Sequence, residues 1–241
     1  MILVETDSKD SAYNFSVEEL FTRYIRKDEP VLMLWQTEKT VMLGNNQVVE
    51  AEVDLEFALT SEIQIVRRSS GGGAIYTDSG TVLYTVIEPL ISDTGTHRER
   101  VASSVIKALG KIGVTAVREG RNDILIDGKK ISGFAQYTSA NHVCTHGSLL
   151  YDTDLDTLTS VLIPNASKLQ PKGIASIRSR VTNIKPYMKE KYTVDEFIRL
   201  LKNELLNNQS YKVHELNTME NEIITRIYNE KYTNPEWNLR M

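Results

Sequence analysis

The sequence predicts an α+β protein in which mixed and antiparallel β-sheets are flanked by helices. Two segments, 62–66 and 81–87, have the alternating or β-rich composition of strands. The Asp127-Gly128 pair lies between two apolar runs, which is a strong signal for a two-residue hairpin turn. Amphipathic segments at helical spacing occur before and after these strands. The length of 241 residues allows one full core, and we expect a single domain over 1–241.

The N-terminal part is expected to begin with a helix and continue with strands. Asp10 and Ser11 can cap this helix, whose apolar residues recur at helical spacing. Glu18 and Glu19 fall mostly off that apolar stripe, and Pro30 ends the segment. In chain order we expect a helix over 11–25, strands over 31–35 and 40–43, a turn over 44–47, a short helix over 53–59, and the strands over 62–66 and 81–87.

Three consecutive glycines, Gly71 to Gly73, separate the last two of these strands. Glycine permits positive φ and lets a ligand approach the backbone closely. The preceding Arg67, Arg68 and two serines add positive charge and hydroxyl donors, which suit a carboxylate or a phosphate. The stretch has neither the lysine nor the spacing of a nucleoside-triphosphate P-loop. It is therefore either an anion-binding loop or a flexible turn beside a solvated basic pair.

The C-terminal part is expected to contain helices, a strand and a long irregular segment. The pattern from Thr193 to Glu196 is a capping box that begins one helix, and Gly113 ends an earlier one. The run His97–Arg100, near the start of the earlier helix, is expected to be a solvated face. In chain order we expect a helix over 96–112, the Asp-Gly hairpin, a strand over 141–150, a helix over 156–161, an irregular segment over 164–187, and helices from 194 and over 218–228.

The hairpin turn assigns the residues of its strands to two faces. The expected pairs are Ile126 with Lys129, Leu125 with Lys130, Ile124 with Ile131, and Asp123 with Ser132. Cross-strand partners share a face, and faces alternate along a strand. One face then carries Ile124, Ile126, Lys129 and Ile131, and the other carries Asp123, Leu125, Lys130 and Ser132. The second face presents a carboxylate, an ammonium and a hydroxyl together, so a polar site here would use Lys130 rather than Lys129.

Composition restricts the classes of function. The net charge of −4 argues against a partner nucleic acid bound by broad charge neutralisation. No apolar run reaches membrane-spanning length and the first residues lack a basic signal-peptide region, so we expect a cytoplasmic protein without a membrane partner. Cys144 is the single cysteine, which excludes an internal disulfide and a thiol-based zinc site. The histidines show no metal-ligand spacing, and we predict no zinc.

Several motifs occur in one order along nearly the whole chain. They are Ala12 to Phe15 with Glu18-Glu19, Leu34 to Gln36, Gly44 to Gln47, Arg67 to Asp78, Asn122 to Gly133, His146 to Leu150, and Gly173 to Asn183. The blocks Arg-Arg-Ser-Ser-Gly-Gly-Gly-Ala and Gly-Lys-Lys-Ile-Ser-Gly are the most specific of these. With them, the sequence resembles the lipoate-protein ligase A family, in a short form lacking the C-terminal accessory domain. That family shares its catalytic fold with biotin-protein ligases.

The resemblance implies an ATP-dependent ligase. Members of the family activate lipoic acid to lipoyl-adenylate and pass the acyl group to a lysine of an acceptor protein. By this resemblance Lys130 is the catalytic residue, and Asp123 lies near the phosphate and its Mg²⁺. The implied ATP or adenylate site comprises Arg68, Gly73, Ala74, Ile75, Tyr76, Asn122, Asp123, Lys130, Lys172 and Arg178. The implied lipoate site comprises Trp35, Arg68, Gly72, Lys130 and His146.

The resemblance also implies protein partners. The acceptors would be lipoyl domains of 2-oxoacid dehydrogenase E2 subunits, the glycine cleavage H protein, or both. The segment from Lys168 to Arg180 matches the adenylate-binding loop of the family, and its positive charge favours docking of an acidic acceptor there. Because we expect no accessory domain in this chain, a separate accessory-domain protein is a further expected partner. The chain would then carry out either the whole reaction with that partner or only the transfer half.

Three residues depart from the family pattern, and other functions remain open. Thr77 stands where histidine is common, Asn45 where arginine is usual, and Phe134 where a small residue is usual. The main alternative is a lipoyl or octanoyl transferase, which forms a thioester on cysteine and needs no ATP. Cys144 is the only candidate for that nucleophile, and a buried structural thiol is the other interpretation of it. A non-catalytic lipoate-binding module is an alternative of a different class.

Overall fold

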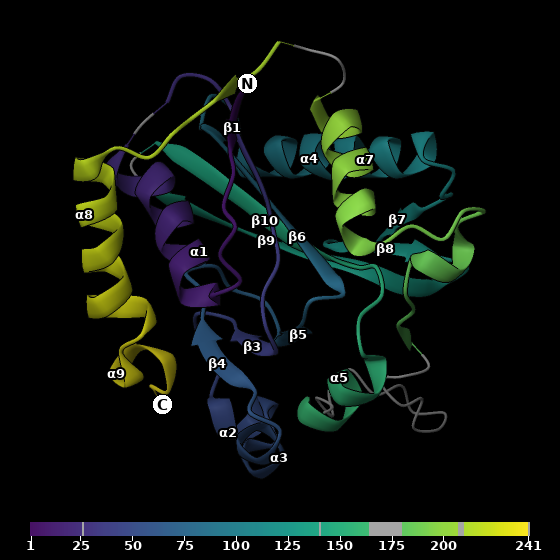
Figure 1. The fold of residues 1–241 in the computed structure, drawn as a ribbon, viewed down its shortest axis with the longest axis horizontal. Helices are drawn as coiled ribbons and strands as arrows, with labels where there is room; N and C mark the ends of the chain where they lie inside the picture. Colours follow the sequence, from purple (N-terminus) through teal and green to yellow (C-terminus); the bar gives the residue numbers. More distant parts are fainter. Residues whose placement is uncertain (26, 140, 164–179, 207–209, 241) are drawn as a thin grey trace.

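The computed structural model describes residues 1–25, 27–139, 141–163, 180–206 and 210–240. An eight-stranded sheet has the order β11-β1-β2-β6-β10-β9-β8-β7, and a three-stranded sheet has the order β4-β3-β5 (Figure 1). The strands are β1 (Ile2–Val4), β2 (Val31–Trp35), β3 (Thr40–Leu43), β4 (Gln64–Arg67), β5 (Ile75–Thr77), β6 (Thr81–Pro89), β7 (Val117–Glu119), β8 (Asp123–Ile126), β9 (Lys129–Ser139), β10 (His142–Leu150) and β11 (Lys212–Val213).

Helices surround both sheets. The α-helices are α1 (Ser11–Glu19), α2 (Val49–Glu52), α3 (Leu55–Thr60), α4 (Thr94–Lys111), α5 (Leu155–Val161), α7 (Val194–Leu206), α8 (Thr218–Ile227) and α9 (Pro235–Asn238). Two π-helical segments, η1 (Leu20–Tyr24) and η4 (Tyr228–Tyr232), continue α1 and α8, and η3 (Lys185–Tyr187) is a 3-10 turn. This arrangement confirms the predicted α+β class with mixed sheets flanked by helices.

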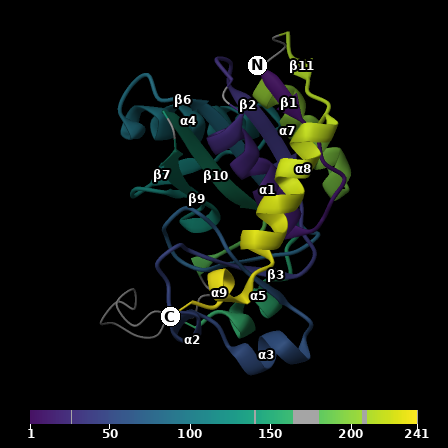
Figure 2. The ribbon, with the colours of Figure 1, turned by 90° about the vertical axis from the view of Figure 1, so that its left-hand side faces the viewer.

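The large sheet separates two apolar layers. Side chains alternate along β6, so that Val82 and Tyr84 belong to one layer while Leu83 belongs to the other. Helices α4 and α7 cover the first layer, with Phe197 of α7 fully buried there. Helices α1 and α8 cover the second, on the opposite side of the sheet, where Phe15 of α1 is buried (Figures 1 and 2). A third cluster joins the small sheet to α2, α3 and α5.

Two helices, α1 and α7, begin at the capping residues predicted from the sequence. Asp10 Oδ1 accepts a hydrogen bond from Ala12 N at 2.8 Å at the start of α1. In the capping box of α7, Thr193 N donates to Glu196 Oε2 at 2.8 Å, and Glu196 N donates to Thr193 Oγ1 at 3.3 Å. These contacts satisfy backbone N–H groups that have no partner inside the helix. Both predicted helix starts are therefore confirmed.

The β8–β9 hairpin has the predicted turn but only part of the predicted register. Asp127 and Gly128 have φ values of 49° and 73°, as a type I′ turn requires. The observed pairs are Ile126 with Lys129, Leu125 with Lys130, Ile124 with Ser132, and Asp123 with Gly133. The last two differ from the prediction because a bulge between Ile124 and Leu125 shifts the ladder by one residue.

Tertiary contacts overturn other expectations from the sequence. His97 is fully buried rather than solvated, and its Nδ1 lies 3.1 Å from Glu88 Oε2. Glu18 and Glu19 are also buried, although they lie off the apolar stripe expected for their helix. The short strands β1, β5, β7 and β11 were not expected. Residues 164–179, most of the expected irregular segment, lie outside the described residues. Within the described ranges, none of the helices combines the length and apolar character needed to cross a bilayer.

Candidate active site

A pocket of about 640 Å³ lies between the small sheet with its glycine loop and strands β8 to β10 of the large sheet. The predicted site residues that the structure describes all line this pocket: Trp35, Arg68, Gly72, Gly73, Ala74, Ile75, Tyr76, Asn122, Asp123, Lys130 and His146. The two remaining predicted ligands, Lys172 and Arg178, lie outside the described residues. Four motifs that are distant in the sequence are thus brought together in one cavity.

Lys130 lies on the polar wall of this pocket. Its Nζ is 2.8 Å from Asp123 Oδ1, and both side chains are partly exposed. Its backbone is paired with β8 on one side. On the other side Val181 forms a parallel bridge with Lys130, and Thr182 N donates to Lys130 O at 3.0 Å. The main chain that carries the ammonium is therefore held from two directions.

Arg68 holds the glycine loop. Its Nη2 donates to Gly71 O at 2.9 Å and to Gly73 O at 2.7 Å. Its Nη1 donates to Met42 O at 2.8 Å, and its Nε donates to Ser70 Oγ at 3.1 Å. The sequence singled out this arginine as a ligand for an anion, and it does line the pocket. Its hydrogen bonds also serve the structure, because they hold two carbonyls of the loop and one carbonyl of strand β3 toward the guanidinium.

The loop stays charged and closely packed. Burial lowers the pKa of the Arg68 guanidinium to about 10, and the Glu18 carboxylate opposes that shift, so Arg68 is a cation at neutral pH.

The backbone of the glycine loop needs glycine at specific positions. Gly72 has a φ of 97°, which favours glycine. A Cβ on Gly44 would lie 2.1 Å from Gly72 O, so the turn after β3 must also be glycine. A Cβ on Gly72 would approach Ala135 of β9 to 4.0 Å, which places the loop opposite the hairpin strand.

Arg67, the other half of the basic pair, does not line the pocket. It is fully buried, and its guanidinium donates to Gly44 O at 3.0 Å and to Gln47 O at 2.6 Å. On its other side it donates to Trp237 O and to Arg240 O, each at 3.0 Å. Burial and then the charge of Arg240 lower the pKa of Arg67. The first arginine of the motif therefore ties the C-terminal segment to the turn behind the glycine loop.

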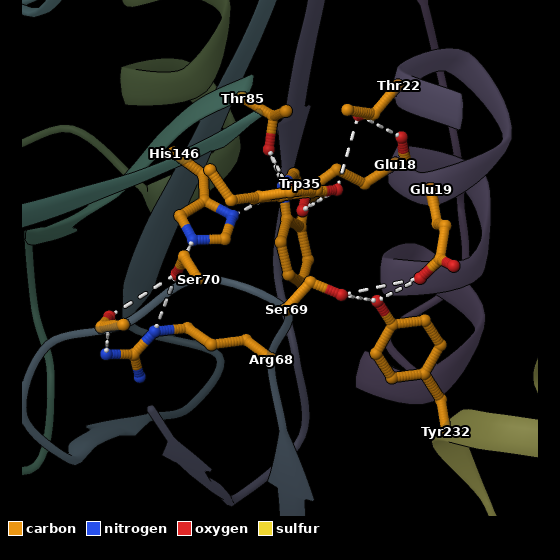
Figure 3. A network of polar contacts seen from close by, with 12 residues as sticks. Glu18, Glu19, Thr22, Trp35, Arg68, Ser69, Ser70, Thr85, His146 and Tyr232 are labelled. Carbon is orange, nitrogen blue, oxygen red and sulfur yellow. Dashed lines mark hydrogen bonds and ion pairs between the residues drawn. The ribbon is translucent and has the colours of Figure 1, made fainter. Parts of the chain in front are cut away.

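A buried polar network reaches the pocket from α1 (Figure 3). Glu18 Oε2 lies 2.8 Å from His146 Nδ1, and His146 Nε2 lies 2.6 Å from Ser70 Oγ. Thr85 Oγ1 donates to the same carboxylate oxygen at 2.9 Å and accepts from Trp35 Nε1 at 3.1 Å. Two of the pocket-lining side chains, Trp35 and His146, are thus oriented through one carboxylate.

A second acid of α1 connects the loop to the C-terminal segment. Glu19 Oε2 accepts from Tyr232 Oη at 2.8 Å and from Lys231 Nζ at 2.5 Å. Ser69 Oγ lies 2.9 Å from Tyr232 Oη and accepts from Lys231 Nζ at 2.8 Å. The roles of Glu18 and Glu19 were not predicted from the sequence. The available signal was two adjacent acids within a helix whose other members are mostly apolar or small.

Cys144 is buried in the apolar layer beneath α1 and is absent from the pocket lining. Burial, followed by the nearby Glu18 carboxylate, raises the pKa of its thiol well above the usual value, so the thiol stays protonated. Its Sγ and the ligand atoms of Glu18 and His146 lie within 4.8 Å of one another. The spacing of histidines along the sequence did not anticipate this grouping. The interpretation of Cys144 as a buried structural thiol agrees with its position.

Comparison with known proteins identifies the family. The family described as the lipoyl protein ligase A/B catalytic domain matches residues 10–206. The chain is 32% identical to the lipoate-protein ligase LplJ of Bacillus subtilis (strain 168) over 242 residues, which cover 99% of this chain and 73% of that protein. It is also similar to a solved lipoate-protein ligase A bound with ATP, with 25% identity, a TM-score of 0.83, and coverage of 99% of this chain and 97% of the other.

Two solved structures from Thermoplasma acidophilum are similar over equally long stretches. One holds bound lipoic acid, with 25% identity, a TM-score of 0.84, and coverage of 100% and 98% of the two chains. The other is a bi-partite lipoate protein ligase described with its E2 lipoyl domain, with 27% identity, a TM-score of 0.83, and coverage of 99% and 95%. These matches confirm the predicted ligase family and its catalytic fold. The chain belongs to the lipoyl protein ligase A/B catalytic-domain family.

Proposed function

We propose that this ligase joins lipoic acid to ATP as lipoyl-adenylate and then transfers the lipoyl group to a lysine of an acceptor protein. The observation that carries the proposal is the position of Lys130 in one pocket with the glycine loop and an apolar end. Phe15, whose ring centroid lies 5.3 Å from that of Trp35, lines the apolar end. The volume of about 640 Å³ lies within the range of small-molecule sites.

The proposed first step needs a cation between two anions. A lipoate carboxylate oxygen attacks the α-phosphorus of ATP, and the bond to pyrophosphate breaks. Both reactants are negative, so a fixed positive charge is needed where the new bond forms. The Lys130 ammonium is suited to this position, and the charged Arg68 supports it from the loop. In the second step the neutral amine of the acceptor lysine attacks the acyl carbonyl, AMP leaves, and the amine loses a proton.

The pocket residues fit a Mg²⁺ ion bound with ATP. Mg²⁺ prefers oxygen ligands and is usually held by one or two carboxylates together with substrate phosphates. Asn122 Oδ1 is buried and has no hydrogen-bond partner among the described residues, and it lines the pocket beside the Asp123 carboxylate. When bound, the ion would neutralise phosphate charge. Within the chain, Asp123 and Asn122 would hold and orient it.

The transferase alternative is less well supported. It requires a reactive cysteine in contact with the substrate. Cys144 is 0% exposed, does not line the pocket and has a raised pKa. The position of Lys130 suits the ATP-dependent reaction better. We therefore retain the transferase only as an outcome that experiments can detect.

The acceptors in this proposal are lipoyl domains of 2-oxoacid dehydrogenase E2 subunits, the glycine cleavage H protein, or both. A bi-partite lipoate protein ligase among the similar structures supports the idea that a separate accessory-domain protein takes part. The basic segment expected to dock the acceptor lies largely outside the described residues. We place the reaction in the cytoplasm.

The test is incubation of the purified chain with lipoate, Mg-ATP and an apo lipoyl domain, followed by mass spectrometry of the acceptor. The expected result is an adduct of the lipoyl mass that depends on ATP. Supplying synthetic lipoyl-adenylate in place of ATP separates the two steps. An adduct with the adenylate but none with ATP would identify a transfer-only chain. No adduct under either condition would refute the proposal.

A further inference from the structure

Gly133 lies directly beneath the ammonium of Lys130. The bulge in the hairpin pairs Asp123 with Gly133, where an uninterrupted ladder would pair Asp123 with Ser132. A Cβ built on Gly133 would lie 2.9 Å from Lys130 Nζ, 3.0 Å from Lys130 Cε and 3.9 Å from Asp123 Oδ1. Ordinary contacts between such atoms are about 3.5–4.0 Å long. The ammonium therefore occupies space that any other residue at position 133 would fill.

We propose that Gly133 is a positioning residue, whose missing side chain lets the Lys130 ammonium lie across β9 and reach Asp123. This inference rests on the proposed function, because it assigns a role in placing the cation of the adenylation step. The 2.8 Å contact between Lys130 and Asp123 holds the ammonium from one side. On the other side, Gly133 has no Cβ, so no side-chain atom at position 133 blocks the ammonium.

The contacts of Gly133 distinguish this role from a packing role. The nearest atoms that an added Cβ would meet belong to the free end of a flexible lysine. At Gly147 of β10, by contrast, an added Cβ would lie 2.4 Å from the ring of the fully buried Tyr84. Gly133 is not among the glycines with a positive φ, so its backbone conformation does not by itself require glycine. A methyl group at position 133 should consequently displace the ammonium without unfolding the protein.

The experiment compares Gly133→Ala with the wild-type chain and with Gly110→Ala as the matched control. Gly110 lies in α4, and a Cβ there would meet no atom within 4 Å. The measurement is lipoate-dependent ATP–pyrophosphate exchange, with kcat and KM determined separately, together with the thermal midpoint of unfolding. If the wild type needs an added accessory-domain protein for exchange, all variants receive the same amount of it.

We expect Gly133→Ala to lower kcat by about 10- to 100-fold, the effect of misplacing a reacting group by about 1 Å. KM for lipoate should change less than kcat, because the apolar end of the pocket, lined by Phe15 and Trp35, is left unchanged. The thermal midpoint should match that of the wild type. A kcat within about twofold of the Gly110→Ala control would overturn the inference. So would a large fall in the thermal midpoint, because it would show a packing role.

A double-mutant cycle with Lys130→Ala tests whether Gly133 acts through the ammonium. Gly133→Ala should lower the rate of exchange little further in the Lys130→Ala background, because the group that the methyl displaces is already absent. Losses that multiply would show that Gly133 acts independently of Lys130 and would overturn the inference. Absence of exchange in the wild type would instead count against the proposed adenylation, which keeps the two failures distinguishable.

Discussion

His146 Nδ1 lies 2.8 Å from Glu18 Oε2, which couples the imidazole of β10 to a buried carboxylate of α1. A carboxylate only accepts hydrogen bonds, so Nδ1 carries the proton in this contact. The opposite ring nitrogen lies 2.6 Å from Ser70 Oγ at the start of the glycine loop. The acid on α1 therefore orients a pocket-lining histidine, and the histidine in turn touches the loop that Arg68 holds.

Replacing this acid should destabilise the protein. Glu18→Ala leaves the donors of His146, Thr85 and Tyr137 without their acceptor in a buried site. We expect the free energy of unfolding to fall by at least about 2 kcal/mol, because a buried polar group without a partner costs roughly 1–3 kcal/mol. Urea denaturation measures the change.

The matched control is Glu222→Ala on α8, where the glutamate is exposed. Its free energy of unfolding should remain within about 0.5 kcal/mol of the wild type. Equal stabilities of the Glu18→Ala and Glu222→Ala variants would contradict the role given to Glu18.

Removing the Arg67 guanidinium should loosen the C-terminal segment. Arg67→Met leaves the carbonyl oxygens of Gly44, Gln47, Trp237 and Arg240 without their donor. Hydrogen bonds to charged groups contribute roughly 1.5–3 kcal/mol each, so we expect a loss of at least about 3 kcal/mol. Denaturation and limited proteolysis near residue 237 measure this effect.

Arg199→Met on the exposed side of α7 is the control for the loss of one positive charge. That variant should unfold and be cleaved like the wild type. If both substitutions left the C-terminal segment equally resistant to protease, Arg67 would not be the residue that anchors it.

Two substitutions separate the ligase from the transferase. Lys130→Ala should lower the rate of lipoate-dependent ATP–pyrophosphate exchange by about 100-fold or more, the usual effect of removing one group that stabilises developing charge. Cys144→Ala should retain exchange and acceptor lipoylation, because the thiol is buried and does not line the pocket. Mass spectrometry of the acceptor reports both variants. Lipoylation that survives Lys130→Ala and disappears in Cys144→Ala would favour the transferase.

The N-cap of α5 should make part of the stability depend on pH. Asp154 accepts hydrogen bonds from Thr157 N at 3.0 Å and from Thr157 Oγ1 at 2.7 Å, and the bonds from Thr157 lower the pKa of this carboxyl below 3.8. A folded pKa below the unfolded one stabilises the protein fully above pH 3.8. That contribution is lost as the pH falls through the folded pKa. Asp154→Ala should cost about 1 kcal/mol at neutral pH.

Thermal midpoints of unfolding measured from pH 7 downward test whether the pKa of Asp154 is lowered in the folded protein. The difference between the wild type and Asp154→Ala should narrow once the pH falls below 3.8. Asp7→Ala, at an exposed position, is the control for the loss of one carboxylate at neutral pH, where its thermal midpoint should match that of the wild type. A difference that widens in acid would show that the direction assigned to the pKa is wrong.

Short-range patterns predicted most of the elements. The spacing of apolar residues located α1, α4 and α7, and the Asp10 and Thr193 caps marked where two of them begin. The Asp127-Gly128 pair predicted the hairpin turn and selected Lys130 over Lys129 for the pocket face. These predictions succeeded because helical spacing, caps and tight turns depend on neighbours within a few positions in the chain.

Contacts between distant segments decided the rest. The bulge that places Asp123 opposite Gly133 arises inside the folded sheet. The two adjacent arginines of one motif have different partners. Arg68 holds the glycine loop, whereas Arg67 donates to carbonyl oxygens of the C-terminal segment. The buried Glu18 carboxylate accepts hydrogen bonds from side chains of β6, β9 and β10. A buried charged side chain is stable only where hydrogen-bonding partners from other segments surround it. The order of residues along the chain does not show which distant segments will supply those partners.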